Sequence, residues 1–155
     1  MSDLEKLQAI ILPSQLQPRL SGRKRHMPRS PFSAKELAIA RVTVQAVIDK
    51  VCPAFGVDPP GTVRVFRTFL SKYRWADGRL NIGWDSKSYI ESVVLHELTH
   101  HILNQNMGPH LHGIVFWEVL WQVIEFYFGN RINYAWQHEY HHGKKYARNR
   151  GIQIK

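Results

Sequence analysis

The segment Ile90–Leu103 reads IESVVLHELTHHIL and contains the clearest chemical motif of this 155-residue chain. Apolar residues on nearly every side of the HELTH motif predict a buried helix. His96 and His100 stand four residues apart, so their rings leave the same face of that helix and can close on one metal ion. Glu97 lies beside that face, where its carboxylate can accept a proton from an activated water. A buried helix with such polar groups needs partners for them, and a metal ion supplies one.

A second match to the same pattern, HEYHH, spans residues 138–142, with His138 and His142 as its outer pair. Gly143 follows at once, and no His, Asp, Glu or Cys stands after His142. A zinc site needs a third protein ligand, usually supplied downstream of this motif. We therefore predict that residues 138–142 form a polar, partly exposed helix end, broken by Gly143, that binds no metal by itself.

Length and composition fit one ordinary domain with one core. The single cysteine, Cys52, excludes a disulfide framework and a four-cysteine zinc module, and it suits a reducing compartment. The N-terminus lacks the basic start and apolar core of a secretion signal. The most apolar stretch, Ile114–Phe128, is too short to span a bilayer and is interrupted by two glutamates. We expect a cytoplasmic protein with no membrane partner.

The net charge of +9 is concentrated at the two ends of the chain. Residues 1–35 hold seven Lys or Arg and two acids, and residues 140–155 hold five Lys or Arg and no acid. Basic arms on a neutral domain commonly hold a polyanion, so DNA or RNA is an expected partner. The alternative, that the arms only keep the chain in solution, stays open. We divide the chain into a basic N-terminal arm (1–32), a core (33–130) and a basic C-terminal extension (131–155).

The core mixes predicted helices and strands. Periodicity and turn residues predict a helix over 34–51, strands over 63–69, 72–75 and 79–84, a helix from a cap at Asp85 or Ser86 to about 105, and a helix over 112–128. Asp77-Gly78 is a tight hairpin signal between the second and third strands. The expected fold class is α+β, with a small antiparallel or mixed sheet packed on a central HExxH helix and flanking helices.

A third metal ligand must come from outside the motif. His101 follows the motif directly, about a third of a turn around the helix, and cannot easily share its metal. His110 and His112 stand in the following loop and at the start of the next helix, where the chain can fold back. Glu118 and Glu125 stand further along that helix. The residues alone leave these candidates open.

The predicted hairpin, the HExxH helix and the following HGIVF segment, residues 112–116, resemble the SprT-like zinc metallopeptidases. The closest resemblance is to the small bacterial and phage metallohydrolases of that zincin group, over about residues 63–128. Their pattern is a helical HExxH, a loop and an H-G-x-x-F element. The resemblance implies that His96, His100 and His112 hold Zn²⁺ and that Glu97 is the catalytic base. The gap before His112 is short, Ile-Val replaces the more usual Pro-Glu, and no cysteine-rich zinc ribbon is present.

The resemblance implies a zincin-like core and a metallopeptidase that hydrolyses a protein or peptide through a metal-activated water and acts near nucleic acid. In zincins the strand before the HExxH helix forms the sheet edge along which a peptide lies, so Asn81, Gly83 and Trp84 are expected near substrate. Two alternatives stay open: a zinc hydrolase of another amide, and a nucleic-acid-binding protein with a zinc-stabilised fold. Glu97 disfavours the last, because a structural zinc site usually has four protein ligands and needs no base.

Overall fold

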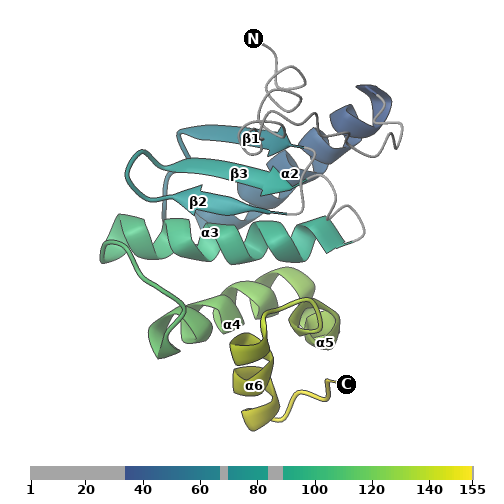
Figure 1. Cartoon of the computed structure of the whole chain (residues 1–155), viewed down its shortest axis with the longest axis vertical. Helices are drawn as coiled ribbons and strands as arrows, with labels where there is room; N and C mark the ends of the chain where they lie inside the picture. Colours follow the sequence, from purple (N-terminus) through teal and green to yellow (C-terminus); the bar gives the residue numbers. More distant parts are fainter. Residues whose placement is uncertain (1–33, 67–69, 84–88, 155) are drawn as a thin grey trace, which may run out of the picture.

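The computed structural model describes residues 34–66, 70–83 and 89–154, and the predicted N-terminal arm, Trp84 and the helix cap at Asp85 or Ser86 lie outside them. Helices and a small sheet follow one another along the chain, which confirms the α+β class. The elements are α2 (Ala34–Ala54), β1 (Thr62–Phe66), β2 (Lys72–Arg74), β3 (Arg79–Gly83), α3 (Ile90–Asn106), α4 (Ile114–Phe128), the 3-10 helix η2 (Gly129–Arg131), α5 (Ile132–Trp136) and α6 (His141–Asn149) (Figure 1).

The sheet is mixed, with strand order β1-β3-β2. β3 pairs in parallel with β1 and antiparallel with β2, and the hairpin between β2 and β3 turns at Gly78, where φ is 67°. The prediction that β3 forms the sheet edge is wrong, because β3 is the central strand. Its residues Leu80 and Ile82 are fully buried, and the central position gives its backbone groups partners on both sides. Among the described strands, β2 is an outer strand next to α3.

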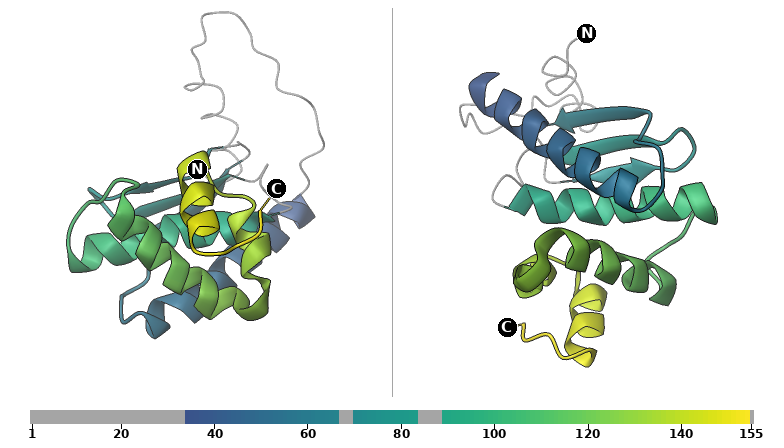
Figure 2. Two further views of the ribbon diagram at one scale, coloured as in Figure 1. Left: turned by 90° about the horizontal axis from the view of Figure 1, so that it is seen from below. Right: turned by 180° about the vertical axis from the view of Figure 1, so that it is seen from behind.

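α3 is the central helix of the molecule. It contacts β2 and β3 on one side, and α2 and α4 also pack against it. Figure 1 shows α3 between the sheet and α4, and the right-hand view of Figure 2 shows α2 crossing the back of the sheet. Val94, Leu95 and Leu98 are therefore fully buried, as predicted for this helix, but so are polar side chains that require partners.

One of these polar side chains, His101, is satisfied entirely by protein groups. Its Nε2–H donates to the Asp58 carbonyl at 2.6 Å, and its Nδ1 accepts from the Tyr73 hydroxyl at 2.8 Å. The same hydroxyl accepts a hydrogen bond from Asn104 Nδ2 at 3.2 Å. Both ring nitrogens of His101 are thus engaged, and the network ties β2 to α3.

The C-terminal extension packs on the core. Trp136 and Ala147 are fully buried, and the Trp136 ring lies 6.4 Å from that of Trp117 in α4. The prediction that Gly143 breaks a helix end is wrong, because α6 begins at His141 and contains Gly143. The absence of a side chain lets α6 approach α4: a Cβ at Gly143 would lie 2.7 Å from Trp117 Cζ3. Close packing, and not helix termination, explains this glycine.

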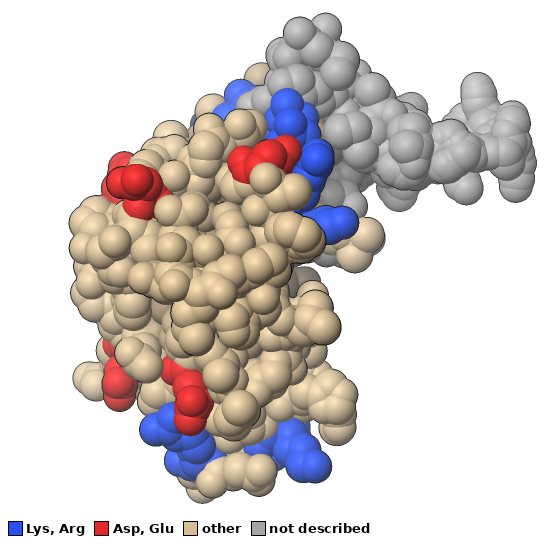
Figure 3. Space-filling model, turned by 90° about the vertical axis from the view of Figure 1, so that its left-hand side faces the viewer, with Lys and Arg blue, Asp and Glu red and all other residues tan. Residues whose placement is uncertain are grey.

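Basic residues of the extension gather on and just beyond α6, where Lys145, Arg148 and Arg150 are exposed. In Figure 3 Lys and Arg side chains are grouped at the lower end of the molecule, where α6 lies, and again at its upper end, and the middle of that face has few. Contact with DNA or RNA stays a prediction. No helix among the described residues combines the length and the apolar character needed to cross a membrane.

We predict that Gly143→Ala lowers the free energy of unfolding by about 1–2 kcal/mol, because overpacking against Trp117 outweighs the better helix propensity of alanine. Urea unfolding checks this. Gly61→Ala is the control, since a Cβ there would have only the Asp77 carbonyl oxygen near, at 3.8 Å. Equal stability of the two variants would contradict the close contact between α6 and α4.

Candidate metal centre

Helix α3 and the loop that follows it bring three histidines close together. His96 and His100 lie one helical turn apart on α3, and His112 lies in the loop before α4. The loop turns back because Gly108 adopts a φ of 96°, a conformation that favours glycine, after the Met107 N–H closes α3 on the Leu103 carbonyl at 2.7 Å. The chain then returns along α3 to His112.

The three side chains present their ring nitrogens to one another. His112 Nε2 lies 2.9 Å from His96 Nε2 and 3.1 Å from His100 Nε2. One nitrogen from each residue lies within 4.8 Å of the other two. Zinc–nitrogen bonds of about 2.0–2.1 Å at tetrahedral angles place ligand nitrogens roughly 3.3 Å apart, so the spacing fits a metal of this size.

Among the candidates that the sequence left open for the third position, the structure brings His112 to the pair. His110 turns its Nδ1–H to the Gly108 carbonyl at 2.9 Å. Glu118 and Glu125 are exposed on α4. Within the described residues, His96, His100 and His112 form the one group of His, Cys, Asp or Glu whose ligand atoms are close enough to share an ion.

The pKa values of two of the three rings are lowered, so these rings are neutral. Burial, and then the proximity of His96 and His112, lower the pKa of His100 to about 3. Burial and His96 also lower the pKa of His112, against the opposing effect of Glu139. A neutral imidazole offers a lone pair, and lone pairs about 3 Å apart repel unless a proton or a cation lies between them. The cluster therefore fits a metal ion chemically as well as in its spacing.

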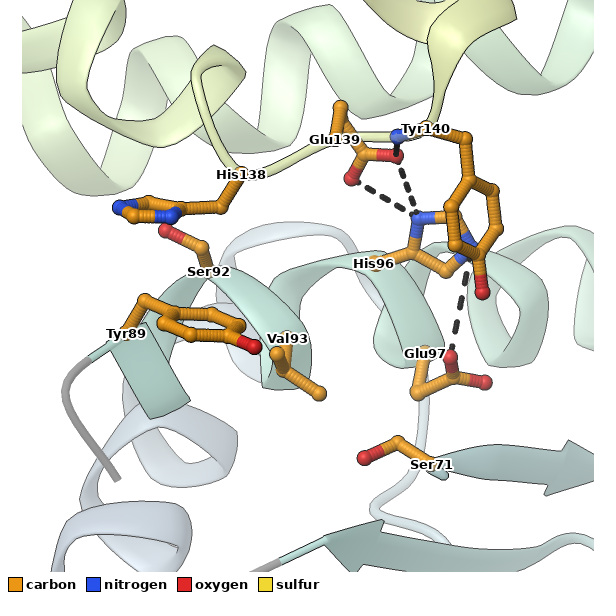
Figure 4. A pocket seen from close by; sticks show the side chains of 9 residues that line it. All are labelled: Ser71, Tyr89, Ser92, Val93, His96, Glu97, His138, Glu139 and Tyr140. Carbon is orange, nitrogen blue, oxygen red and sulfur yellow. Dashed lines mark hydrogen bonds and ion pairs between the residues drawn. The ribbon is translucent and has the colours of Figure 1, made fainter. Parts of the chain in front are cut away.

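A buried carboxylate, Glu139, orients the ring of His96. Its two oxygens lie 3.0 and 2.9 Å from His96 Nδ1, which donates to them (Figure 4). Burial lowers the pKa of His96, but the charge and hydrogen bond of Glu139, with a contribution from Glu97, raise it above its ordinary value overall. Because Glu139 holds a proton on Nδ1 of His96, the Nε2 atom of the same ring faces the other two histidines. Carboxylates in this position behind a metal-binding histidine fix its tautomer and orientation.

Glu97 is buried beside the cluster, with Oε2 4.0 Å from His96 Nε2. Burial raises the pKa of Glu97 to about 7; His96 and a hydrogen bond with the Tyr73 backbone oppose the rise, and Glu139 adds to it. A carboxyl group that titrates near neutral pH is well matched to proton transfer at that pH.

Two cavities meet at His96, Glu97 and Tyr140. The smaller, of about 130 Å³, lies toward the N-terminal end of α3, and the larger, of about 210 Å³, lies beside β2 and the loop that carries His112. The Tyr140 ring centre is 5.2 Å from that of His96, and in Figure 4 its hydroxyl points toward Glu97. The cluster is therefore reached from two sides.

The positions of Glu139 and Tyr140 at the cluster were not predicted from the sequence, because the pattern of residues 138–142 indicated a helix end. A sequence signal for a buried Glu139 was present: the His-Glu pair of the first motif is repeated at His138-Glu139, close to the apolar Trp136. The histidines of that motif do not join the cluster: the His138 ring stacks on Tyr89 at 4.5 Å between centres, and His142 is exposed. The second motif thus provides a carboxylate behind the first.

Comparisons with protein-family models, curated proteins and solved structures find no match to this chain. The likeness to SprT-like metallopeptidases stays a prediction from the motifs.

We predict that the purified protein binds about one zinc ion per chain. His96→Ala, His100→Ala and His112→Ala should each remove it, because each takes away one of three converging nitrogens. His138→Ala and His142→Ala are matched controls that should retain the metal. Elemental analysis of the folded variants measures this, and a second tightly bound zinc lost with His138 or His142 would contradict the single site.

We predict that Glu139→Ala weakens zinc binding about 10- to 100-fold, because His96 loses the carboxylate that orients it. Competition with a chelator of known affinity measures the change. Glu118→Ala removes an exposed carboxylate from α4 and should leave the affinity unaltered. An affinity of Glu139→Ala equal to that of the control would show that the hydrogen bond does not support the metal centre.

Proposed function

We propose that this protein is a zinc-dependent hydrolase of amide bonds, with peptides as its substrates. The observation that carries the proposal is the convergence of three histidine nitrogens beside the buried Glu97, where two cavities meet. Structural zinc sites are usually closed by four protein ligands, whereas catalytic sites use three and keep one position open. The described residues offer three protein ligands, which is the number typical of a catalytic site.

Imidazole nitrogens suit zinc, copper, iron and nickel, and we choose zinc because three histidines with one open position form a common catalytic zinc site. Bound by His96, His100 and His112, it would supply Lewis acidity to a water molecule and to a substrate carbonyl. Glu139 would keep the His96 ring in the orientation that this binding requires.

Glu97 is the residue that moves the proton in this proposal. Its carboxylate accepts a proton from the water as the water oxygen bonds to the carbonyl carbon. The same proton then passes to the amide nitrogen as the carbon–nitrogen bond breaks, which leaves an acid and an amine. The buried position of Glu97 supports this role, because it holds the carboxylate beside the histidine cluster, with Oε2 4.0 Å from His96 Nε2.

The outer strand β2 supports a peptide over other amides. β2 pairs only with β3 among the described strands, and Ser71, Lys72 and Tyr73 line the larger cavity beside Glu97. An extended peptide can add to an outer strand through main-chain hydrogen bonds. This position replaces the one inferred for β3, which has neighbours on both sides.

We predict that Glu97→Gln lowers hydrolysis by a factor on the order of a hundred to ten thousand while zinc content and folding are retained, because the amide keeps the shape but cannot act as a base. The assay is cleavage of an unfolded casein-like protein by zinc-loaded enzyme, followed by mass spectrometry. Glu125→Gln, in an exposed position on α4, is the control that should remain fully active.

Two outcomes would reject the proposed function. One is the absence of cleavage by wild-type protein that contains its zinc. The other is equal activity of Glu97→Gln and wild type, since the buried carboxylate would then have no part in the reaction.

A further inference from the structure

We infer that the smaller cavity is a binding subsite for an uncharged polar side chain of the substrate, such as serine, threonine or asparagine. The inference rests on the proposed peptide hydrolysis and specifies which peptides are preferred. The first observation concerns Ser92, which lies on α3 one turn before His96. The Ser92 side chain lines the smaller cavity.

The Ser92 hydroxyl is buried, with the residue 6% exposed, and has no hydrogen-bond partner. Serine and threonine within helices commonly satisfy themselves on the carbonyl four residues earlier. Thr99 does so, donating to the Leu95 carbonyl at 2.8 Å, whereas Ser92 is the third residue of α3 and has no carbonyl of that helix four residues before it. Buried polar groups without a partner are rare in proteins, so a hydroxyl left free at the wall of a cavity points to a group that enters the cavity.

Further polar groups surround the same space. Ser71 Oγ accepts the Gly83 N–H at 2.7 Å, which leaves its own hydrogen free to donate. The His138 ring is stacked on Tyr89 and lines the same cavity as Ser92. Burial, together with the charge of Lys144, lowers the pKa of His138, so the ring is neutral and offers one donor and one acceptor.

The carboxylates near the cavity have other tasks. Both oxygens of Glu139 accept from His96, and Glu97 is the proposed base. Glu139 is paired with His96, and the proposed metal would lie beside Glu97, so a cationic side chain finds no carboxylate without a positive partner, and both carboxylates would repel an anionic side chain. Hydrogen bonding without net charge is therefore the chemistry that this cavity offers.

The larger cavity is lined by more apolar side chains than the smaller one, so the two sides of the proposed reaction centre differ in polarity. Trp75 and Leu111 line it, with 60% and 88% of their surfaces exposed, together with Pro109. These groups suit an apolar side chain. A substrate across the centre would thus place a polar residue on one side of the cleaved bond and an apolar residue on the other.

The test is digestion of a randomised peptide library by the zinc-loaded full chain, with the residues flanking each cleavage identified by mass spectrometry. Wild type should favour serine, threonine or asparagine on one side. Ser92→Ala should lower the preference for a serine peptide over its alanine counterpart roughly three- to tenfold, the effect of one lost hydrogen bond, with zinc content unchanged. Leu111→Ala is the matched control and should alter only the apolar side.

Three results would overturn the subsite: no polar preference, a preference for lysine or arginine, or an unchanged serine-to-alanine ratio in Ser92→Ala. If zinc-loaded wild type cleaves no peptide, the proposed function is wrong. A binding measurement with a small serine derivative then tests the subsite independently of hydrolysis. N-acetylserinamide should then shift the NMR signals of the His138 ring in wild type and not in Ser92→Ala. Equal shifts with N-acetylalaninamide, or none with either compound, would reject the subsite.

Discussion

The hydrogen bonds between His96 and Glu139 join two parts of the molecule that are far apart in the sequence. His96 belongs to the central helix under the sheet, and Glu139 to the short connection between α5 and α6. The Glu139 side chain is only 6% exposed, and a buried carboxylate is costly unless it is paired. The packing of α5 and α6 on α4 places it against His96, so the geometry of the histidine cluster depends on helices that contribute no nitrogen to it.

The buried histidines of α3 differ in how much of their hydrogen bonding the protein satisfies. His101 has a protein partner on each ring nitrogen and needs nothing more. His96 has Glu139 on one nitrogen and turns the other to the cluster. This difference separates a histidine that stabilises the fold from one arranged for a ligand, although both lie in the same helix and are almost fully buried.

Features encoded by local sequence were predictable. The buried HExxH helix follows from its apolar flanks, and the hairpin follows from Asp77-Gly78. The convergence of His112 on the helix pair was anticipated from a family resemblance, because spacing alone left His110 and Glu118 open. The central position of β3 was not predictable in this way, since its parallel pairing with β1 joins residues that no local pattern links. Glu139 was missed for a similar reason: its position depends on the close packing of Gly143 against Trp117, a contact between distant helices.

The place of Glu139 after the three histidines in the sequence has a consequence for biosynthesis. A ribosome makes His96, His100 and His112 well before the segment that carries Glu139 and α6, and folding during synthesis proceeds from the N-terminal side. The nascent chain therefore holds the three histidines before it holds the carboxylate that orients the first of them. The first histidine is therefore oriented only after residue 139 has been made and α6 has packed on α4.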